Sequence, residues 1–304
     1  MNLNLKSTSR GLTHHVIMTF GSSRLHRRSV GRMPEMLRAT YRSVKLWLDI
    51  RRNSPLPEPL KSQVRSDALR LIRSSRTPSG LVGYKISHRG ADHLRYLFQE
   101  IFVDACYFFR SDNPAPMIID CGSNIGMSIL FFKRLYPLCT IVGFEPDPNT
   151  FQALTENVSQ NRIANVDLHN VAVGNTDGIV AFHRSDNPSG SDLRMSMLPS
   201  RISGQTIKVP VRKLSSFIKS DIDLLKLDVE GVEKSVLDDL ESSAALRRIK
   251  QIHLEYHHHI DGAVDNLSET LSLLERNGFG YQMQTARTWM PGSFQDVSIF
   301  AYRK

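Results

Sequence analysis

The chain has 304 residues, of which 40% are hydrophobic, and it can therefore form one sizeable α/β domain with an extension. Its apolar runs are shorter than the roughly 20 residues that cross a membrane, which excludes a membrane-spanning protein. Its three cysteines show no paired spacing, which excludes a disulfide-rich protein and predicts a cytoplasmic protein with free thiols. The formal net charge of +9 comes entirely from residues 1–89, which contain 18 Lys and Arg against 4 Asp and Glu, whereas residues 90–304 contain 21 against 26.

The basic N-terminal third divides into a tail and a helical extension. Residues 1–32 contain no Asp or Glu and are expected to form a basic tail without fixed structure. Residues 33–89 form a basic helical extension, because apolar residues at helical spacing predict helices at 33–52 and 62–74. We interpret the basic faces as solvated surface. Contact of residues 33–75 with a membrane surface or a protein partner is the alternative, and no nucleic-acid-binding motif accompanies the charge.

Residues 90–304 form the main domain, in which short apolar runs alternate with helical patterns. Turn signals between residues 178 and 215 predict a β-hairpin insertion. The alternation predicts an open sheet covered by helices on both faces, with seven strands that are mostly parallel and an antiparallel end strand. The predicted helices are 93–109, 127–136, 149–161, 232–240 and 266–277, and the predicted strands are 117–120, 140–144, 166–173, 223–228, 251–256, 281–285 and 297–302.

The turn after the first predicted strand has the chemistry of a nucleoside-binding site. In the sequence DCGSNIG, which runs from Asp120 to Gly126, Gly122 allows a tight turn and Gly126 allows the next helix to approach closely. A dinucleotide site would carry a G-x-G-x-x-G turn, whereas this turn has G-x-x-x-G with a carboxylate two residues before its first glycine. An Asp beside a diphosphate is unfavourable, but S-adenosyl-L-methionine carries positive groups and no phosphate. The turn therefore favours this methyl donor over NAD.

An acidic residue also ends the second predicted strand. Glu145 lies 23 residues after Gly122, where a carboxylate can accept hydrogen bonds from both ribose hydroxyls. A partner for the N-terminus of the following helix is the structural alternative, but Asp147 is nearer to that helix. Together with Asp120, Glu145 indicates a nucleoside donor.

Five stretches within residues 117–302 together resemble the FkbM family of methyltransferases. They are IIDCGSNIG, GFEPDP, NVDLHNVAVGNTDG, LLKLDVEGVE and HLEYH, in this order. The resemblance implies a Rossmann-like class I methyltransferase fold, S-adenosyl-L-methionine as cofactor, and methylation of a hydroxyl on a sugar, polyketide or similar metabolite. Carried over by position, the resemblance implies that Gly122 and Asn124 line the methionine part, that Glu145 binds the ribose, and that the adenine edge meets Asn170, Val171 and Ala172.

Methylating a hydroxyl requires a base near the acceptor oxygen, because a neutral hydroxyl is a poor nucleophile. The candidates end the fourth and fifth predicted strands, and they are Asp228, Glu230, Glu255 and His257. Glu255 and His257 share one strand face because their spacing is two, and His257 is the better base by its ordinary pKa. The structural alternatives are that Glu230 supplies the N-terminal charge of the next helix and that the three histidines 257–259 form a polar loop.

We do not expect a catalytic divalent metal. The resemblance does not require one, and the three consecutive histidines are not expected to bind zinc, since adjacent side chains on an extended chain point apart. The leading hypothesis is an O-methyltransferase that acts on a small hydroxylated acceptor, with the hairpin insertion forming part of the acceptor pocket. The alternative is a catalytically weak binding module of the same fold, tethered to a partner or membrane by its basic N-terminal helices.

Two further enzyme classes fit the motifs less well. A nucleic-acid or protein methyltransferase would carry an N/D-P-P-Y-type motif after the fourth strand, where this chain has DVEG. An NAD-dependent oxidoreductase ranks last, because the turn after the first strand has G-x-x-x-G and a preceding carboxylate in place of G-x-G-x-x-G. The acceptor's identity and the oligomeric state stay open.

Overall fold

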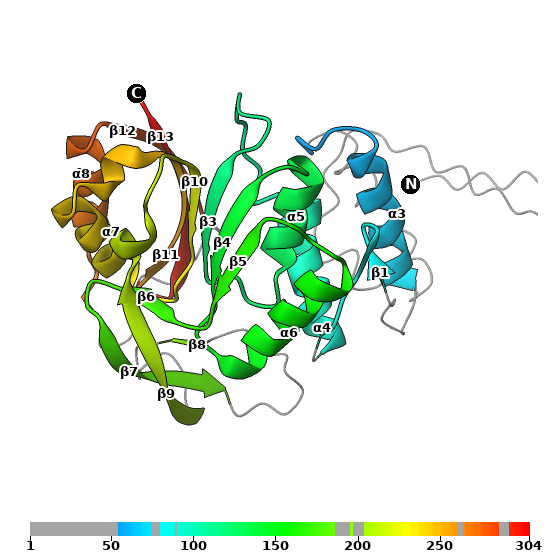
Figure 1. The fold of residues 1–304 in the computed structure, drawn as a ribbon, viewed down its shortest axis with the longest axis horizontal. Coiled ribbons are helices and arrows are strands. Elements are labelled where there is room, and N and C mark those ends of the chain that lie inside the picture. The colour runs from blue at the N-terminus through cyan, green and yellow to red at the C-terminus, as the bar shows by residue number, and fades with distance from the viewer. Residues whose placement is uncertain are drawn as a thin grey trace, which may run out of the picture. The chain divides into compact units, whose positions relative to one another are not determined.

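The computed structural model describes residues 54–73, 80–88, 90–185, 195–196, 204–260, 264–285 and 292–304 (Figure 1). The predicted tail at residues 1–32 and the predicted helix at 33–52 lie outside the described residues. Within the described residues, no helix is long and apolar enough to cross a membrane.

A seven-stranded sheet is the main structural element and confirms the predicted Rossmann-like class I methyltransferase fold. Its strand order is β12-β13-β11-β10-β3-β4-β5. β10, β11, β3, β4 and β5 are parallel, whereas β13, the last strand of the chain, runs antiparallel to both of its neighbours. Every residue of β10 is buried, as expected for a strand covered on both faces. The strands are β3 (Met117–Cys121), β4 (Thr140–Phe144), β5 (Val166–His169), β10 (Ile222–Leu227), β11 (Ile249–His258), β12 (Phe279–Thr285) and β13 (Gln295–Arg303).

Helices cover both faces of this sheet, and neighbouring residues of one strand enter opposite cores. Ile118 of β3 packs in the core that contains α3, α4, α5 and α6, whereas Ile119 packs with α7 and α8. The helix α3 joins the first core through side chains at helical spacing, namely Leu60, Val64, Ala68 and Leu71. The α-helices are α3 (Leu60–Arg73), α4 (Ala91–Phe98), α5 (Met127–Leu135), α6 (Pro148–Gln160), α7 (Glu233–Ser242) and α8 (Leu267–Arg276); the shorter elements are η3 (Leu214–Phe217), η4 (Ala245–Arg248), β1 (Gly80–Leu81) and β2 (Tyr84–Lys85).

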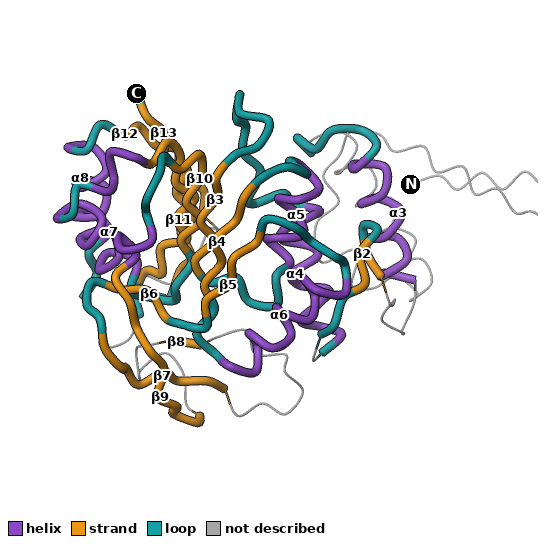
Figure 2. Tube along the Cα trace, viewed as in Figure 1, coloured by secondary structure: helices purple, strands orange, loops and turns teal. Residues whose placement is uncertain are grey.

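A smaller four-stranded sheet contains the expected hairpin insertion. Its order is β6-β9-β7-β8, and β7 pairs antiparallel with β9 along its whole length. In Figure 2 this sheet lies at the edge where the parallel strands of the large sheet end. Its strands are β6 (Ala172–Gly174), β7 (Gly178–Ser185), β8 (Met195–Ser196) and β9 (Gly204–Lys213).

Two predicted elements are wrong in their extent. The strand expected at 166–173 divides into β5 and β6, because the side chain of Asn170 donates hydrogen bonds to the backbone oxygens of Glu145 and Pro146 and ties the chain to the end of β4. The helix expected at 93–109 passes from α4 into the π-helix η1 (Gln99–Val103). It stops there because Ala105 adopts a φ of +54°.

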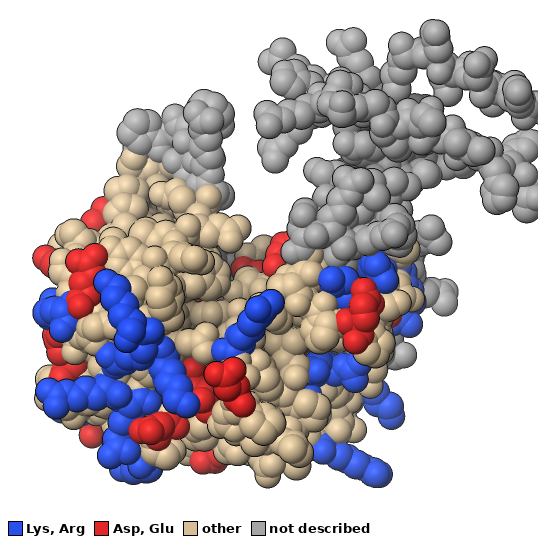
Figure 3. All heavy atoms as spheres, turned by 90° about the horizontal axis from the view of Figure 1, so that it is seen from above, with Lys and Arg blue, Asp and Glu red and all other residues tan. Residues whose placement is uncertain are grey.

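Charged side chains of both signs occur together on the surface. On the face shown in Figure 3, Lys and Arg of the described residues are interspersed with Asp and Glu. The described part of that face therefore has mixed charge rather than one continuous basic surface.

Candidate active site

A pocket opens at the carboxyl ends of β3, β4 and β10, where ligands bind in open α/β sheets. It encloses about 820 Å³ of empty space, its open mouth included. The predicted site residues that line it are Gly122, Asn124, Glu145, Val171, Ala172, Asp228 and Glu230. The predicted site residues that do not line it are Asp120, Gly126, Asn170, Glu255 and His257.

The glycine turn after β3 packs directly against the loop after β10. Gly122 has a φ of +81°, and a Cβ atom there would lie 2.0 Å from the backbone oxygen of Asp228. Gly126 has a φ of +89°, and its Cβ would lie 2.7 Å from Leu154 of α6. Both positions therefore require glycine, and the first one places the predicted donor end of the pocket beside the predicted acceptor end.

Asp120 is fully buried and does not line the pocket. Its Oδ2 accepts a hydrogen bond of 2.6 Å from the hydroxyl of Ser128, and its Oδ1 lies 3.5 Å from Nζ of Lys226. Asp120, which the sequence grouped with Glu145 at the donor site, therefore reaches the pocket only through Lys226, whose ammonium its carboxylate contacts.

Lys226 is a site residue that the sequence analysis missed. Its buried Nζ donates to the backbone oxygens of Gly122 at 2.6 Å and Cys121 at 3.2 Å, and it lies 3.2 Å from Oδ2 of Asp228. Burial alone would lower the pKa of Lys226, but the carboxylates of Asp228 and Asp120 outweigh it and raise that pKa. The available signal was a single lysine inside the otherwise apolar run before Asp228, since buried charges need partners.

Glu145 is held in the pocket wall by two backbone donors. Its Oε2 accepts from the N–H of Asn124 at 3.0 Å, and its Oε1 accepts from the N–H of Asp147 at 2.9 Å. Burial is the main cause that raises the pKa of Glu145, to about 8. Asp147 caps α6 by accepting from the N–H of Thr150, so Glu145 is not the residue that caps this helix.

Asp228 is an ionised carboxylate at the other end of the pocket. Its Oδ2 lies 3.2 Å from Nζ of Lys226 and accepts a hydrogen bond of 3.3 Å from the hydroxyl of Tyr107. Burial alone would raise the pKa of Asp228, but Lys226 and His257 outweigh it and hold that pKa below its ordinary value. A carboxylate with a lowered pKa is a weak base, although it can accept hydrogen bonds.

His257 lies behind this end of the pocket, among carboxylates. Its Nδ1 lies 2.7 Å from Oε1 of Glu233, and its Nε2 lies 3.3 Å from Oε2 of Glu230. Burial alone would lower the pKa of His257, but these carboxylates outweigh it and raise the pKa to about 10. The preference for His257 as a base, which rested on its ordinary pKa, is therefore corrected: at neutral pH the imidazole already holds its proton.

Glu230 and Glu255 flank His257 from two elements. Glu230 has a φ of +61° and precedes α7, whose first turn contains Glu233 instead, so Glu233 supplies the N-terminal charge of this helix. Glu255 shares a strand face with His257, as its spacing predicted, and burial is the main cause that raises its pKa well above the ordinary value.

Three groups of described residues have the donor types and spacing that a metal ion can use. Their ligand atoms lie within 4.8 Å of one another, and the groups are Asp228 with Glu230 and His257, Glu255 with His257 and Asp296, and His258 with His259 and Asp265. Carboxylate-rich groups are chemically suited to hard divalent cations.

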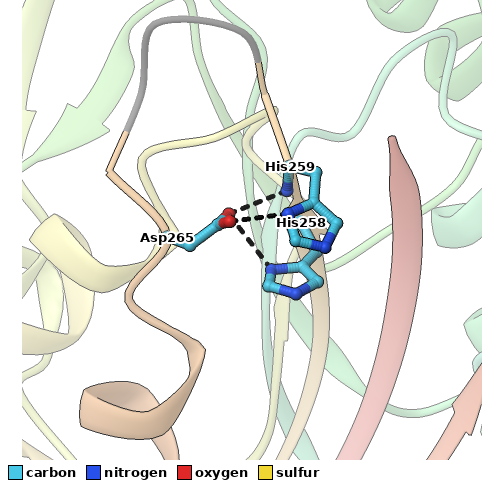
Figure 4. Close-up of side chains that lie close together, drawn as sticks. All are labelled: His258, His259 and Asp265. Carbon is cyan, nitrogen blue, oxygen red and sulfur yellow. Dashed lines mark hydrogen bonds and ion pairs between the residues drawn. The ribbon is translucent and has the colours of Figure 1, made fainter. Parts of the chain in front are cut away.

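The last of these groups departs from the expected side-chain directions. His258 and His259 both turn Nδ1 toward the carboxylate of Asp265, at 3.1 and 2.6 Å (Figure 4). The expectation that neighbouring histidines point apart is wrong for this pair, because His259 leaves the strand with a φ of +58°.

Two further pocket residues were missed because they precede every recognisable motif. Tyr107 donates to Asp228, and Glu100 lines the pocket from η1. Their approach depends on the path of the chain between α4 and β3, for which the local sequence carried no signal.

Comparisons with known proteins show the family of this chain. A family model described as the Methyltransferase FkbM domain matches residues 120–281. The chain is 31% identical over 243 residues to 31-O-demethyl-FK506 methyltransferase FkbM of Streptomyces tacrolimicus, covering 69% of this chain and 89% of that protein. It is 28% identical over 237 residues to Methyltransferase 1 of Beauveria bassiana (strain ARSEF 2860), covering 69% and 90%. It is also 28% identical over 162 residues to 2-O-methyltransferase NoeI of Sinorhizobium fredii (strain NBRC 101917 / NGR234), covering 48% and 65%.

Proposed function

Because this chain belongs to the FkbM family of S-adenosyl-L-methionine-dependent methyltransferases, we propose that it methylates a hydroxyl oxygen of a sugar, glycan, polyketide or similar small metabolite. Two similar proteins carry names that specify an oxygen acceptor, 31-O-demethyl-FK506 methyltransferase and 2-O-methyltransferase. Those names support oxygen as the acceptor atom here. No observation on the described residues favours the alternative of a catalytically weak binding module.

We place S-adenosyl-L-methionine at the end of the pocket that the Gly122 turn and Glu145 line. The Gly122 turn lines this part of the pocket with backbone rather than a side chain, and the buried Glu145 carboxyl also lies in the pocket wall. We assign the methionine part to Gly122 and Asn124, the ribose to Glu145, and the adenine to Val171 and Ala172. When bound, the donor supplies an electrophilic methyl group on a positively charged sulfur.

The acceptor end of the pocket is rich in carboxylates. Asp228 and Glu230 line it, and the hydroxyl of Tyr107 points to Asp228. Carboxylates accept hydrogen bonds from hydroxyl groups and repel anions, so a neutral polyhydroxylated acceptor fits this end better than a phosphorylated one. In this assignment Asp228 and Glu230 orient the acceptor, while the charged His257 holds Glu230 in place.

The observation that carries the proposal is the close packing of the Gly122 turn on the loop at Asp228, because it puts donor and acceptor ends side by side. The donor assignment is tested by measuring S-adenosyl-L-methionine binding to Glu145→Ala by isothermal titration calorimetry. Loss of the side chain that accepts hydrogen bonds from the ribose leaves those hydroxyls without a partner and predicts roughly tenfold weaker binding. Glu156→Ala, on the exposed side of α6, is the matched control and should bind like wild type. Equal affinity of Glu145→Ala and wild type rejects the ribose assignment.

The acceptor assignment is tested by transfer of a labelled methyl group. Purified protein is incubated with S-[methyl-³H]adenosyl-L-methionine and hydroxylated probes, namely methyl glucoside, methyl fucoside and cyclohexane-1,2-diol. Label in an O-methyl product supports the proposal. Label that enters only amine or carboxylic acid probes rejects oxygen as the acceptor atom.

A further inference from the structure

Glu100 enters the pocket from an unusual helical segment. The π-helix η1 follows α4 directly, and Leu97, Glu100 and Ile101 line the pocket from this junction. A π turn adds a residue to the helical repeat and changes the direction of the side chains after it, and such turns often occur at functional sites. The junction therefore places one carboxylate between apolar neighbours in the pocket wall, near enough to Asp228 and Lys226 to be affected by their charges.

The other carboxylates of the pocket wall are held by stronger partners. Glu145 accepts two backbone hydrogen bonds, Asp228 lies 3.2 Å from the Lys226 ammonium, and Glu230 lies 3.3 Å from the charged His257. Among the described residues, the contact of the Glu100 carboxylate is the Tyr96 hydroxyl, at the long distance of 3.5 Å. Glu100 is thus the wall carboxylate whose oxygens are most available to an acceptor hydroxyl.

We propose that Glu100 is the general base that removes the proton of the acceptor hydroxyl, an inference that rests on the proposed O-methylation. The acceptor O–H bond breaks as its proton passes to a Glu100 oxygen, and the acceptor oxygen keeps the electron pair. A pair on that oxygen forms the new bond to the methyl carbon, while the donor sulfur retains the pair of the breaking carbon–sulfur bond. The products are an ether, protonated Glu100 and a neutral thioether.

The surroundings of Glu100 suit this role near neutral pH. Burial is the main cause that raises the pKa of Glu100, to about 7, with Asp228 and Asp296 raising it further and Lys226 and the Tyr96 hydroxyl lowering it. Cys106, Tyr107 and Glu255 also face this charge. A base whose pKa lies near the working pH is both available in its ionised form and strong enough to accept a proton. Turnover should therefore rise with pH through about 7 as Glu100 ionises.

Glu100→Gln tests this role because it keeps the size of the side chain and removes its basicity. With any probe that wild type methylates, we expect the variant to lower single-turnover methyl transfer by roughly 100-fold or more. Its affinity for S-adenosyl-L-methionine should stay within about twofold of wild type, which also reports that the variant folds. Glu156→Gln, an exposed position on α6, is the charge-matched control and should transfer at the wild-type rate. Transfer by Glu100→Gln within about threefold of wild type overturns the proposal.

Two outcomes separate this proposal from the proposed function. If wild type methylates a hydroxylated probe and its pH profile keeps the same inflection in Glu100→Gln, the function stands and the role of Glu100 is overturned. If no probe is methylated, the Glu100 carboxyl is followed directly by NMR in protein labelled with [δ-¹³C]glutamate, where its signal is the one missing from Glu100→Gln. A Glu100 signal that titrates near pH 7 supports the proposal. A signal that shows the carboxyl already ionised at about pH 5 overturns it.

Discussion

Gly122→Ala should destabilise the protein and weaken donor binding, because the turn has no room for a side chain. A φ of +81° costs an alanine about 1–2 kcal/mol, and a Cβ atom 2.0 Å from the backbone oxygen of Asp228 forces the two loops apart. Displacement of packed backbone adds about 1–3 kcal/mol, so the total loss in the free energy of unfolding is roughly 2–5 kcal/mol. Urea denaturation followed by circular dichroism measures this loss, and calorimetry measures donor affinity.

Gly292→Ala is the matched control for backbone strain alone. Its φ is +72°, but nothing lies within 4 Å of the Cβ position, so it should lose only the conformational part of about 1–2 kcal/mol. Donor affinity should not change in this variant, because Gly292 does not line the pocket. If Gly122→Ala is as stable as Gly292→Ala and binds the donor as tightly, the contact between the two loops contributes neither to stability nor to donor binding, and the prediction is wrong.

Three further perturbations test the charges of the site. Because the pKa of Glu145 is raised to about 8 and its ionised form is the better hydrogen-bond acceptor, the ratio of wild-type to Glu145→Gln donor affinity should increase from pH 7 to pH 9; a constant ratio in calorimetry would reject this. Lys226→Met leaves the buried Asp120 and the partly buried Asp228 without their cation and should cost about 3–5 kcal/mol in urea denaturation. Lys250→Met, at an ion pair with an exposed ammonium, should cost about 0–1 kcal/mol. Because the pKa of His257 is raised from 6.5 to about 10 on folding, its contribution to stability is fully present below pH 6.5 and is lost as the pH rises through 10. Wild type should therefore lose stability relative to His257→Gln over this range, and a constant difference would contradict the assigned charge.

Much of the fold was predictable from local patterns. The alternation of apolar runs and helical repeats depends on side-chain direction within one element, and it correctly predicted the seven strands of the large sheet. The polar residues at the strand ends also predicted where the pocket lies, because parallel strands end at the same edge of the sheet. Gly122, Glu145 and Asp228 do line one pocket there.

The exact boundaries failed where a distant contact decided the path of the chain. Asn170 interrupts the expected third strand by bonding to the end of β4, a neighbour that the sequence of this strand does not contain. The π-helix at Glu100 likewise has no local signal that distinguishes it from an α-helix.

By itself, the sequence determined the fold class, the glycine turn and the pocket carboxylate at the end of β4, because each depends on the geometry of a few consecutive residues or on strand-end position. Only the tertiary structure decided how the ionisable groups behave. Asp120 pairs with a lysine from β10, His257 is enclosed by carboxylates, and Glu100 reaches the pocket from η1. The protonation state of each group and the ion pairs that it forms depend on charges that are far apart along the chain, and folding alone brings these charges close together.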